Sequence, residues 1–426
     1  MIGMAVVFLL IFIVLGVPVA FAIGFSGFLA LVFGGDVPAF MAVQQMVKGV
    51  NSFPLMACPL FILAGEIMGG AKLSDRIIDF ARELVSWMKG GVGCVCVVAN
   101  MIFSAITGSG AAAISAVGGL TAPELKKIGY KSGFVSALIA GAGALGPIIP
   151  PSMNMIVYGS ITGDSVGKLF VGGIMPGVII GVCLMGMCFL YSRKYNIDGG
   201  SGTFSVPRLW KAFRDSFFAM LTPLIIIGGV ITGIFTATEA GVIACVYGLA
   251  CGLFIYRTIT FQDLIPIFRK ATESSCMVMM IMGIATIYSY IFAVENVGAV
   301  VRDFLLSITT DPTIMMILIA CLMLVVGMFM ETLAAMSVLL PLLYPVAMQL
   351  GCDPIQFGVM FTISTVMGGL SPPVGVYLFQ SMGITGATFK EVVPHMIPVV
   401  LIVLGTMFGI IFFPGIATFL PNLLMG

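Results

Sequence analysis

Apolar segments of roughly 16–25 residues recur along the whole chain, and each is about long enough to cross the hydrocarbon core of a membrane. Only 9% of the 426 residues are charged, whereas soluble domains carry about a quarter charged residues. The segments are continuous rather than alternating, which favours helices over the strands of a membrane barrel. The sequence therefore predicts an all-α polytopic membrane protein.

Two of these segments are interrupted by prolines in the same way. Gly143–Thr162 reads GALGPIIPPSMNMIVYGSIT, and Gly368–Thr385 reads GGLSPPVGVYLFQSMGIT. Proline lacks a backbone N–H and clashes with the preceding turn, so each Pro-Pro pair breaks its helix. Backbone groups freed in this way are tolerated at membrane depth only beside protein or a water-filled cavity. For either break alone, a kink that merely shapes packing is the alternative interpretation.

The two breaks belong to an internal repeat. A shift of 222 residues, applied without a gap, places identical residues on one another: Ala112 on Ala334, Ala113 on Ala335, Ser115 on Ser337, Leu120 on Leu342, Pro123 on Pro345, Gly129 on Gly351, Gly146 on Gly368, and Pro150-Pro151 on Pro372-Pro373. The sequence therefore predicts two copies of the same helical arrangement. Each copy contains a helical hairpin followed by a Pro-Pro broken helix.

The basic residues predict how the copies are oriented, because short cytoplasmic loops collect Lys and Arg. Sixteen of the nineteen Lys and Arg lie inside if Gly91–Leu125 enters and leaves the membrane from the cytoplasm and Ile314–Leu350 from the outside. The basic loop 193–216 is then cytoplasmic. The two copies would cross the membrane in opposite directions, and inverted repeats with re-entrant hairpins are the architecture of secondary transporters.

The hairpin tips and the breaks supply the candidate binding residues. The first tip, Ser104–Ala113, is rich in small residues that let a backbone turn within the membrane. The second tip carries Glu331, and a carboxylate in a membrane segment suggests a function unless external water solvates it. Ser109, Ser152 and Asn154 lie nearest to the breaks, and either substrate binding or helix capping explains them. Glu239 is explained equally well by capping or by transport.

At this point the chain resembles the large membrane (M) subunit of a TRAP (tripartite ATP-independent periplasmic) transporter over essentially its whole length. The resemblance rests on a series of motifs: Gly16–Phe21 (GVPVAF), Pro59–Glu66 (PLFILAGE), Gly108–Gly110 (GSG), Ile149–Ser152 (IPPS), Gly172–Gly177 (GGIMPG), Gly233–Ala240 (GIFTATEA) and Ser371–Gly375 (SPPVG).

The resemblance implies a sodium-coupled importer of an organic acid, such as a dicarboxylate, sialic acid or another sugar acid. It implies an elevator-type fold of the ion transporter superfamily, placed in a bacterial inner membrane. Two partners follow: a small membrane (Q) subunit and a periplasmic substrate-binding (P) protein. Neither an enzymatic activity nor an organic cofactor is expected.

The resemblance also implies site residues. The first sodium site would use Ser104, Thr107, Gly146, Ile149 and Pro150, and the second would use Gly327, Gly368, Ser371 and Val374. The substrate would contact Ser109, Ser152, Asn154 and Glu331.

The same resemblance predicts a division of the chain into moving and fixed parts. Scaffold would comprise residues 1–71 and 217–294, and arm helices would comprise 72–90 and 295–310. The transport domain would comprise 91–192 and 311–426, with 193–216 as the cytoplasmic linker.

Other function classes fit the sequence less well. A stand-alone sodium- or proton-coupled carboxylate transporter without partner subunits is the main alternative. An intramembrane enzyme would need paired acid and base groups, and His395 is the chain's one histidine. A channel fits poorly with two opposed hairpins. No GxxxxGK[ST] phosphate-binding motif is present, so ATP is not the expected energy source.

Overall fold

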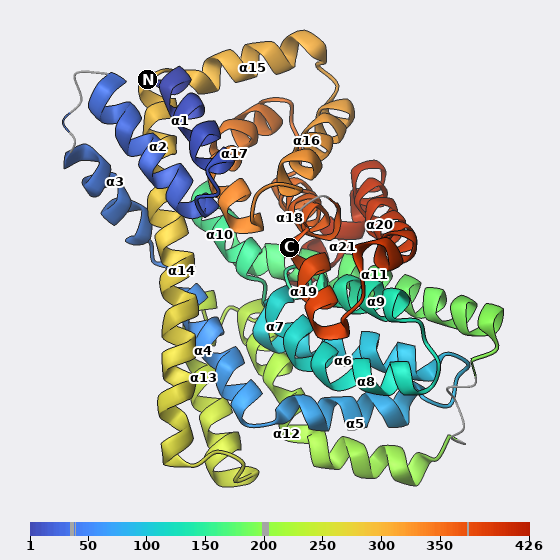
Figure 1. Cartoon of the computed structure of the whole chain (residues 1–426). Helices are drawn as coiled ribbons and strands as arrows, with labels where there is room; N and C mark the ends of the chain where they lie inside the picture. Colours follow the sequence, from blue (N-terminus) through green and yellow to red (C-terminus); the bar gives the residue numbers. More distant parts are fainter. Residues whose placement is uncertain (35–37, 39, 198–203, 373–374) are drawn as a thin grey trace.

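The computed structural model describes the chain except for residues 35–37, 39, 198–203 and 373–374, and the described part is helical with no strand (Figure 1). Within these described ranges, six helices are long and apolar enough to cross a membrane. Two further helix pairs, bent by 70° and 120°, raise the number of candidate spans to eight. The prediction of a helical, multi-pass protein is confirmed.

The described elements follow one another in chain order, with α-helices numbered α1–α21. They are α1 (Ile2–Val14), α2 (Val19–Gly34), α3 (Phe40–Val50), the 3₁₀ turn η1 (Pro54–Met56), α4 (Ala57–Gly70), α5 (Leu73–Val85), α6 (Gly91–Thr107), α7 (Gly110–Ala113), the π-helix η2 (Ile114–Gly118), α8 (Gly119–Lys127), α9 (Ser132–Gly143), α10 (Met153–Thr162), α11 (Val166–Tyr195), α12 (Val206–Ile231), α13 (Ala237–Ala250), the π-helix η3 (Cys251–Ile255), α14 (Phe261–Val294), α15 (Val297–Ile308), α16 (Pro312–Gly327), α17 (Thr332–Gln349), α18 (Pro354–Leu370), α19 (Val376–Thr385), α20 (Phe389–Phe412) and α21 (Gly415–Met425).

The helix pattern of the first half recurs in the second half at nearly the predicted spacing. Helix α9 begins at Ser132 and α18 begins at Pro354, 222 residues later. The helices after the Pro-Pro breaks, α10 and α19, begin 223 residues apart, as do α11 and α20. Helix α9 ends before the first break and α18 ends before the second, so both predicted breaks are present.

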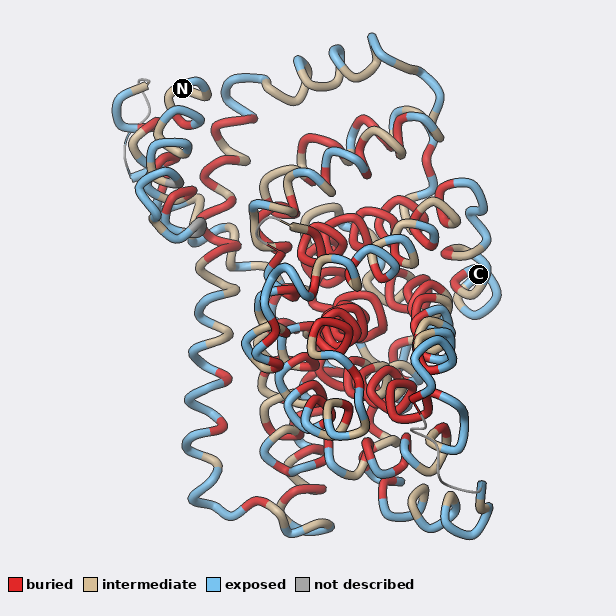
Figure 2. Tube along the Cα trace, turned by 45° about the vertical axis from the view of Figure 1, so that its right-hand side comes forward, coloured by how far each residue is buried: buried red, intermediate tan, exposed pale blue. Residues whose placement is uncertain are grey.

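The two helices that precede the breaks form the centre of the molecule. Helix α9 is buried along nearly its whole length, and so is α18. Figure 2 shows this buried centre wrapped by helices that expose one face. Apolar side chains on those outer faces are what a bilayer requires, since lipid replaces water around the protein.

The half-helices beyond the breaks are exchanged between the two copies. Helix α19, from the second copy, packs against α9, η2 and α8 of the first copy. Helix α10, from the first copy, packs against α17 and α18 of the second copy. Each hairpin therefore packs against the half-helix of the other half of the chain.

The long helix α14 runs along one side of the molecule, where it packs against α2, α3 and α4 (Figure 1). Helix α4 also packs against α13. An ion pair of 2.8 Å joins Lys270 on α14 to Glu66 on α4. At the start of α13, Thr236 and Glu239 form a reciprocal capping box, which confirms the capping interpretation of Glu239.

Two short helices occupy the positions predicted for arms. Helix α5 is amphipathic: Ile77, Ile78 and Ala81 are buried, whereas Asp75 and Arg82 lie on its charged side. Helix α15 has no fully buried residue and turns by 120° into α16. The division of the chain into scaffold, arms and transport domain stays a prediction.

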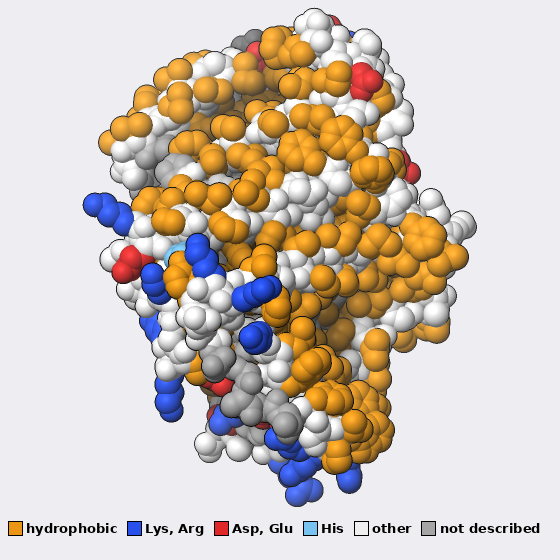
Figure 3. Space-filling model, turned by 90° about the vertical axis from the view of Figure 1, so that its right-hand side faces the viewer, with side chains coloured by type: hydrophobic (Ala, Val, Ile, Leu, Met, Phe, Trp, Pro, Cys, Tyr) orange, Lys and Arg blue, Asp and Glu red, His pale blue; other side chains and the backbone are white. Residues whose placement is uncertain are grey.

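Lys and Arg side chains gather toward one end of the molecule. Figure 3 shows them clustered over the lower part of one face, while hydrophobic side chains cover most of the rest. This distribution agrees with a cytoplasmic position for the basic segments on either side of residues 198–203.

We expect a cysteine at Lys211 to be cytoplasmic and one at Thr310 to be external, because basic residues cluster around the first position and not around the second. Both positions are exposed. In a variant without the ten native cysteines, a membrane-impermeant maleimide added to intact spheroplasts should label the Thr310 variant alone. Labelling of the Lys211 variant alone would contradict the predicted orientation.

Candidate functional site

The first hairpin turns at a glycine that no other residue could replace easily. Helix α6 ends at Thr107, and Gly108 then adopts a positive φ of +62°. Its N–H donates to the Ser104 carbonyl at 2.9 Å, which closes the helix end. A Cβ atom on Gly108 would lie 2.3 Å from the carbonyl oxygen of Pro151. The tip of hairpin 1 is therefore pressed onto the first Pro-Pro break.

The second hairpin is closed by its carboxylate. Glu331 is the N-cap of α17, and its Oε2 accepts hydrogen bonds from the N–H groups of Leu333 (2.9 Å) and Ala334 (3.2 Å). Its Oε1 accepts a bond from the Thr332 hydroxyl at 3.0 Å. A negative charge at a helix N-terminus is favourable, because unpaired N–H groups point toward it. Glu331 thus has a structural role at the tip, and its predicted substrate contact stays a prediction.

Each hairpin lies against the break of its own copy through glycine. A Cβ on Gly146 would lie 2.5 Å from the Gly110 nitrogen, and a Cβ on Gly368 would lie 2.4 Å from the Cα of Gly327. Gly146 and Gly368 are the two glycines that the sequence repeat places on one another. The close approach of tip and break is therefore a duplicated feature.

The residues of the first predicted sodium site lie on both sides of the contact between tip 1 and the first break. The Ser104 hydroxyl is fully buried and has no hydrogen-bond partner among the described residues. The Thr107 hydroxyl donates to the Phe103 carbonyl at 3.2 Å. Gly146 touches the tip, as described above, and Pro151, next to Pro150, touches it through Gly108.

The side chain of Ile149 points away from this cluster. A Cβ on Gly177 of α11 would lie 2.5 Å from Ile149 Cγ1, and Ile149 lines a groove beside α6. Its N–H donates to the Leu145 carbonyl at 2.7 Å. Only its backbone could therefore serve an ion at the break.

The second predicted site is partly described. Gly327 and Gly368 are in contact. The Ser371 hydroxyl donates to the Met367 carbonyl at 3.0 Å, and the Ser371 carbonyl accepts from the Gly375 N–H at 3.2 Å. Val374 lies outside the described residues.

The predicted substrate residues divide into caps and one unpaired group. Ser109 accepts a bond from the Ala112 N–H at 3.4 Å and caps α7. Ser152 caps α10 by accepting from the Met155 N–H at 3.2 Å, while its hydroxyl donates to the Pro147 carbonyl. The capping interpretation is confirmed for both serines. Asn154 differs, because its buried Nδ2 has no partner in the described part of the chain.

Two residues that sequence analysis missed pack the second broken helix against hairpin 1. The ring of Tyr377 on α19 approaches Gly110, whose Cβ would lie 2.9 Å from it, and the same ring lies 2.9 Å from a Cβ built on Gly369 at the second break. Gln380, one turn later, donates to the Ala111 carbonyl and the Ser115 hydroxyl, both at 2.9 Å. The only signal in the sequence was their position directly after the second break.

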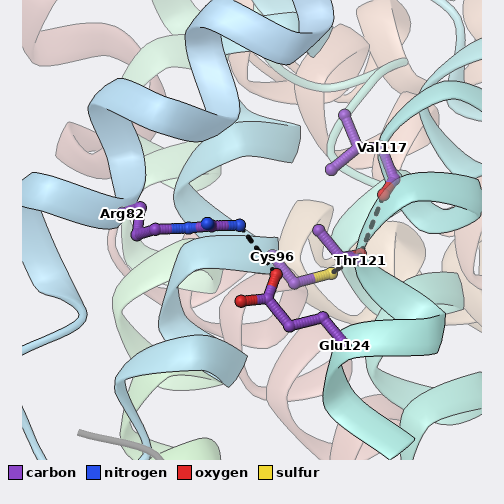
Figure 4. A network of polar contacts seen from close by, with 5 residues as sticks. All are labelled: Arg82, Cys96, Val117, Thr121 and Glu124. Carbon is purple, nitrogen blue, oxygen red and sulfur yellow. Dashed lines mark hydrogen bonds and ion pairs between the residues drawn. The ribbon is translucent and has the colours of Figure 1, made fainter. Parts of the chain in front are cut away.

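The base of hairpin 1 is bonded to α5, the predicted arm helix, as Figure 4 shows. Arg82 on α5 donates to Glu124 Oε2 on α8 at 2.8 Å. On the same helix, the Thr121 hydroxyl donates to the Val117 carbonyl at 2.8 Å and contacts Cys96 Sγ at 3.4 Å. Cys96 is fully buried on α6, so it serves the packing of α6 against α8.

The site offers oxygen ligands rather than a metal-binding cluster. Among the described residues no group of three His, Cys, Asp or Glu side chains could hold a metal ion. The tips and breaks instead bring together carbonyl and hydroxyl oxygens, which suit a hard cation.

Comparison with known proteins identifies the relatives of this chain. The family model "Tripartite ATP-independent periplasmic transporter, DctM component" matches residues 6–416. The sialic acid TRAP transporter large permease protein SiaM of Vibrio cholerae is 32% identical over 417 residues, with 96% of each chain covered. The isethionate TRAP transporter permease protein DctMQ of Oleidesulfovibrio alaskensis is 35% identical over 96% of this chain, which spans 64% of that protein.

A solved structure supports the fold. The YdaH transporter of Alcanivorax borkumensis superimposes with a TM-score of 0.66 at 13% identity, covering 88% of this chain and 87% of that one. At this identity the likeness concerns the fold alone.

We expect Gly368→Ala to destabilise the protein by about 1–3 kcal/mol, because the added methyl group meets the Gly327 backbone at 2.4 Å and neither backbone can move cheaply. Gly383→Ala on α19 is the matched control, since a Cβ there meets nothing within 4 Å. Thermal unfolding in detergent should show a lower midpoint for the first variant and an unchanged or slightly higher midpoint for the second, since alanine favours a helix over glycine. Equal midpoints for the two variants would show that tip and break are not in firm contact.

Proposed function

Because the chain belongs to the DctM family of TRAP transporter large permeases, we propose that it is the subunit that moves an organic acid across the bacterial inner membrane with sodium as the coupling ion. The membrane-spanning fold and the family membership support transport as its activity. The cargo and the ion are the parts that experiment has to test.

The observation that carries the sodium proposal is the duplicated contact between tip and break. At both places a glycine pair brings backbone to within contact distance, at Gly110/Gly146 and at Gly327/Gly368. Because proline has no N–H, the Gly143 and Gly368 carbonyls lack their usual partner four residues on and accept instead from Gly146 and Ser371. Carbonyls that leave the helical pattern in this way coordinate small cations in broken membrane helices. The unpaired Ser104 hydroxyl supplies an additional oxygen at the first site. A buried hydroxyl without a partner costs free energy, and a bound cation would satisfy it.

The cargo proposed is an organic anion. The names of two relatives specify sialic acid and isethionate, and both compounds are acids. The buried Nδ2 of Asn154 is an unpaired donor in the first turn of α10, and the preceding Met153 N–H approaches the Gly108 carbonyl of tip 1 at 3.5 Å. The N-termini of α7 and α10 also present N–H groups. Donors of this kind suit a carboxylate or sulfonate at the boundary between the two hairpins.

The proposed mechanism is an elevator built from two inverted repeats. Residues 91–192 and 311–426 would move together, because the exchanged half-helices α10 and α19 bind each part to the other. Helices α5 and α15 would connect this unit to the scaffold. The Arg82–Glu124 pair is one contact across that connection.

The proposed partners are a small membrane subunit and a periplasmic binding protein. The relative from O. alaskensis, named DctMQ, extends well beyond the region that this chain matches, which favours a partner over the stand-alone alternative. The chain would then be the carrier subunit of a larger assembly.

The decisive assay is uptake into proteoliposomes that contain the chain with its co-expressed partner subunits. A panel of radiolabelled organic acids should be accumulated when an inward sodium gradient is imposed, and the rate should rise sigmoidally with sodium. Undiminished uptake with potassium or choline in place of sodium would disprove the coupling, whichever acid is carried.

Ser104→Ala separates an ion ligand from a packing residue. Because the hydroxyl has no partner among the described residues, its removal should leave stability in sodium-free buffer unchanged or slightly higher. If it binds sodium, the sodium concentration for half-maximal uptake should rise about tenfold, the equivalent of ~1.4 kcal/mol. Ser136→Ala is the control, because that hydroxyl is bonded to Ser381 at 2.8 Å. It should lower stability and leave sodium dependence unaltered, and the reverse pattern would remove Ser104 from the site.

A further inference from the structure

A groove of about 300 Å³ lies between α6, α11 and α12. All of its lining side chains are hydrophobic, including Met101 and Ala105 on α6, Ile174 on α11 and Phe213 on α12. At its inner end it reaches Ile149, next to the first Pro-Pro pair. Apart from Ile149, none of its lining residues belongs to the predicted ion or substrate sites.

The groove opens on the outer, lipid-facing surface. Val178, Phe217 and Leu224 line it and are exposed by 45%, 40% and 67%. They belong to α11 and α12, two of the helices that are long and apolar enough to cross the membrane. Around such helices hydrocarbon replaces water, so an opening with this lining is filled by something apolar.

The groove is long enough for an acyl chain. On α12 the lining extends from Phe213 to Leu224, which at 1.5 Å per residue is about 16 Å. The acyl chains of one leaflet span about half of a hydrocarbon core that is about 30 Å thick, so a single chain of this extent fits the groove.

The outer end of the groove carries the residues typical of a membrane interface. Trp210 is exposed and stacks on Phe213, with ring centroids 5.6 Å apart. At about 100° per residue, Arg214 points from α12 in nearly the same direction as Leu221, which lies about two turns later. Arg214 is therefore at the edge of the helix face that lines the groove. Arg214 is exposed, and the structure gives it no ion pair with another described residue. Trp marks the headgroup level, and Arg near it attracts anionic lipid.

We propose that this groove is a binding site for a glycerophospholipid, with one acyl chain between α6, α11 and α12 and the phosphate against Arg214. The lipid would belong to the cytoplasmic leaflet, because the basic segment that begins α12 is predicted to be cytoplasmic. The occupancy of the site does not depend on the proposed sodium coupling.

A lipid at this position would affect how the two predicted parts of the chain move, and this effect rests on the proposed function. Helix α12 leads into the predicted scaffold, while α6 and α11 belong to the predicted transport part. An acyl chain between them would fill a boundary at which the two parts slide. Through Ile149 it would also touch the helix break of the first sodium site.

Photo-crosslinking tests the site directly. The full chain is placed in phosphatidylcholine nanodiscs that contain a small fraction of phosphatidylglycerol with a diazirine in its acyl chain. After irradiation, peptide mass spectrometry should find adducts concentrated on the segments around Met101, Ile174 and Met220. The filling variants Ala105→Phe and Ile174→Phe should lose most of these adducts, whereas Leu401→Phe, on the exposed face of α20, should not.

The headgroup contact has a separate readout. Arg214→Gln should lower the groove adducts of the phosphatidylglycerol probe about fivefold, the ratio that corresponds to ~1 kcal/mol. Arg214→Lys should restore them, and Arg193→Gln, another exposed basic position, should have no effect. Adducts spread evenly over all exposed helices, or unchanged in both filling variants, would overturn the proposal. Crosslinks to a helix of a co-purified small subunit in place of lipid would overturn it as well.

Discussion

A backbone that leaves the helix at membrane depth must find partners for its polar groups, and the rest of this structure follows from that constraint. The Pro-Pro breaks free carbonyls, and the glycine-rich hairpin tips are pressed against those breaks. Gly108 against Pro151 and Gly368 against Gly327 leave no room for a side chain. Breaks and tips are therefore one unit, and a change at either is felt by the other.

The exchange of half-helices joins the two units. Because α19 packs on hairpin 1 and α10 packs on hairpin 2, neither site is built from one half of the chain alone. Tyr377 is an example, since its ring contacts Gly110 of the first tip and Gly369 beside the second break. Such an arrangement allows binding at one tip to alter the other, which is what coupling of ion and cargo requires.

The features that depend on local chemistry could be predicted from the sequence. Proline and glycine determine where a membrane helix ends, so the residue pattern alone located the breaks and the tip glycines. The contacts of Gln380 could not be predicted, because Ala111 lies 269 residues away and no polar pattern around Gln380 points to it. The sequence also could not decide between capping and substrate binding for Ser152, because a hydroxyl near a helix end can do either. Inversion of the repeats, the elevator motion and sodium binding remain predictions.

Sodium binding where the two tips meet their breaks is the step on which the proposed transport depends. Hydrogen exchange of the purified protein, followed by mass spectrometry, measures how firmly the amides of Gly108–Ala113 and Thr332–Ala335 are held there. If sodium binds at both breaks, sodium slows exchange in both segments and potassium at equal ionic strength does not. Equal exchange in the two salts at both tips would contradict sodium binding there.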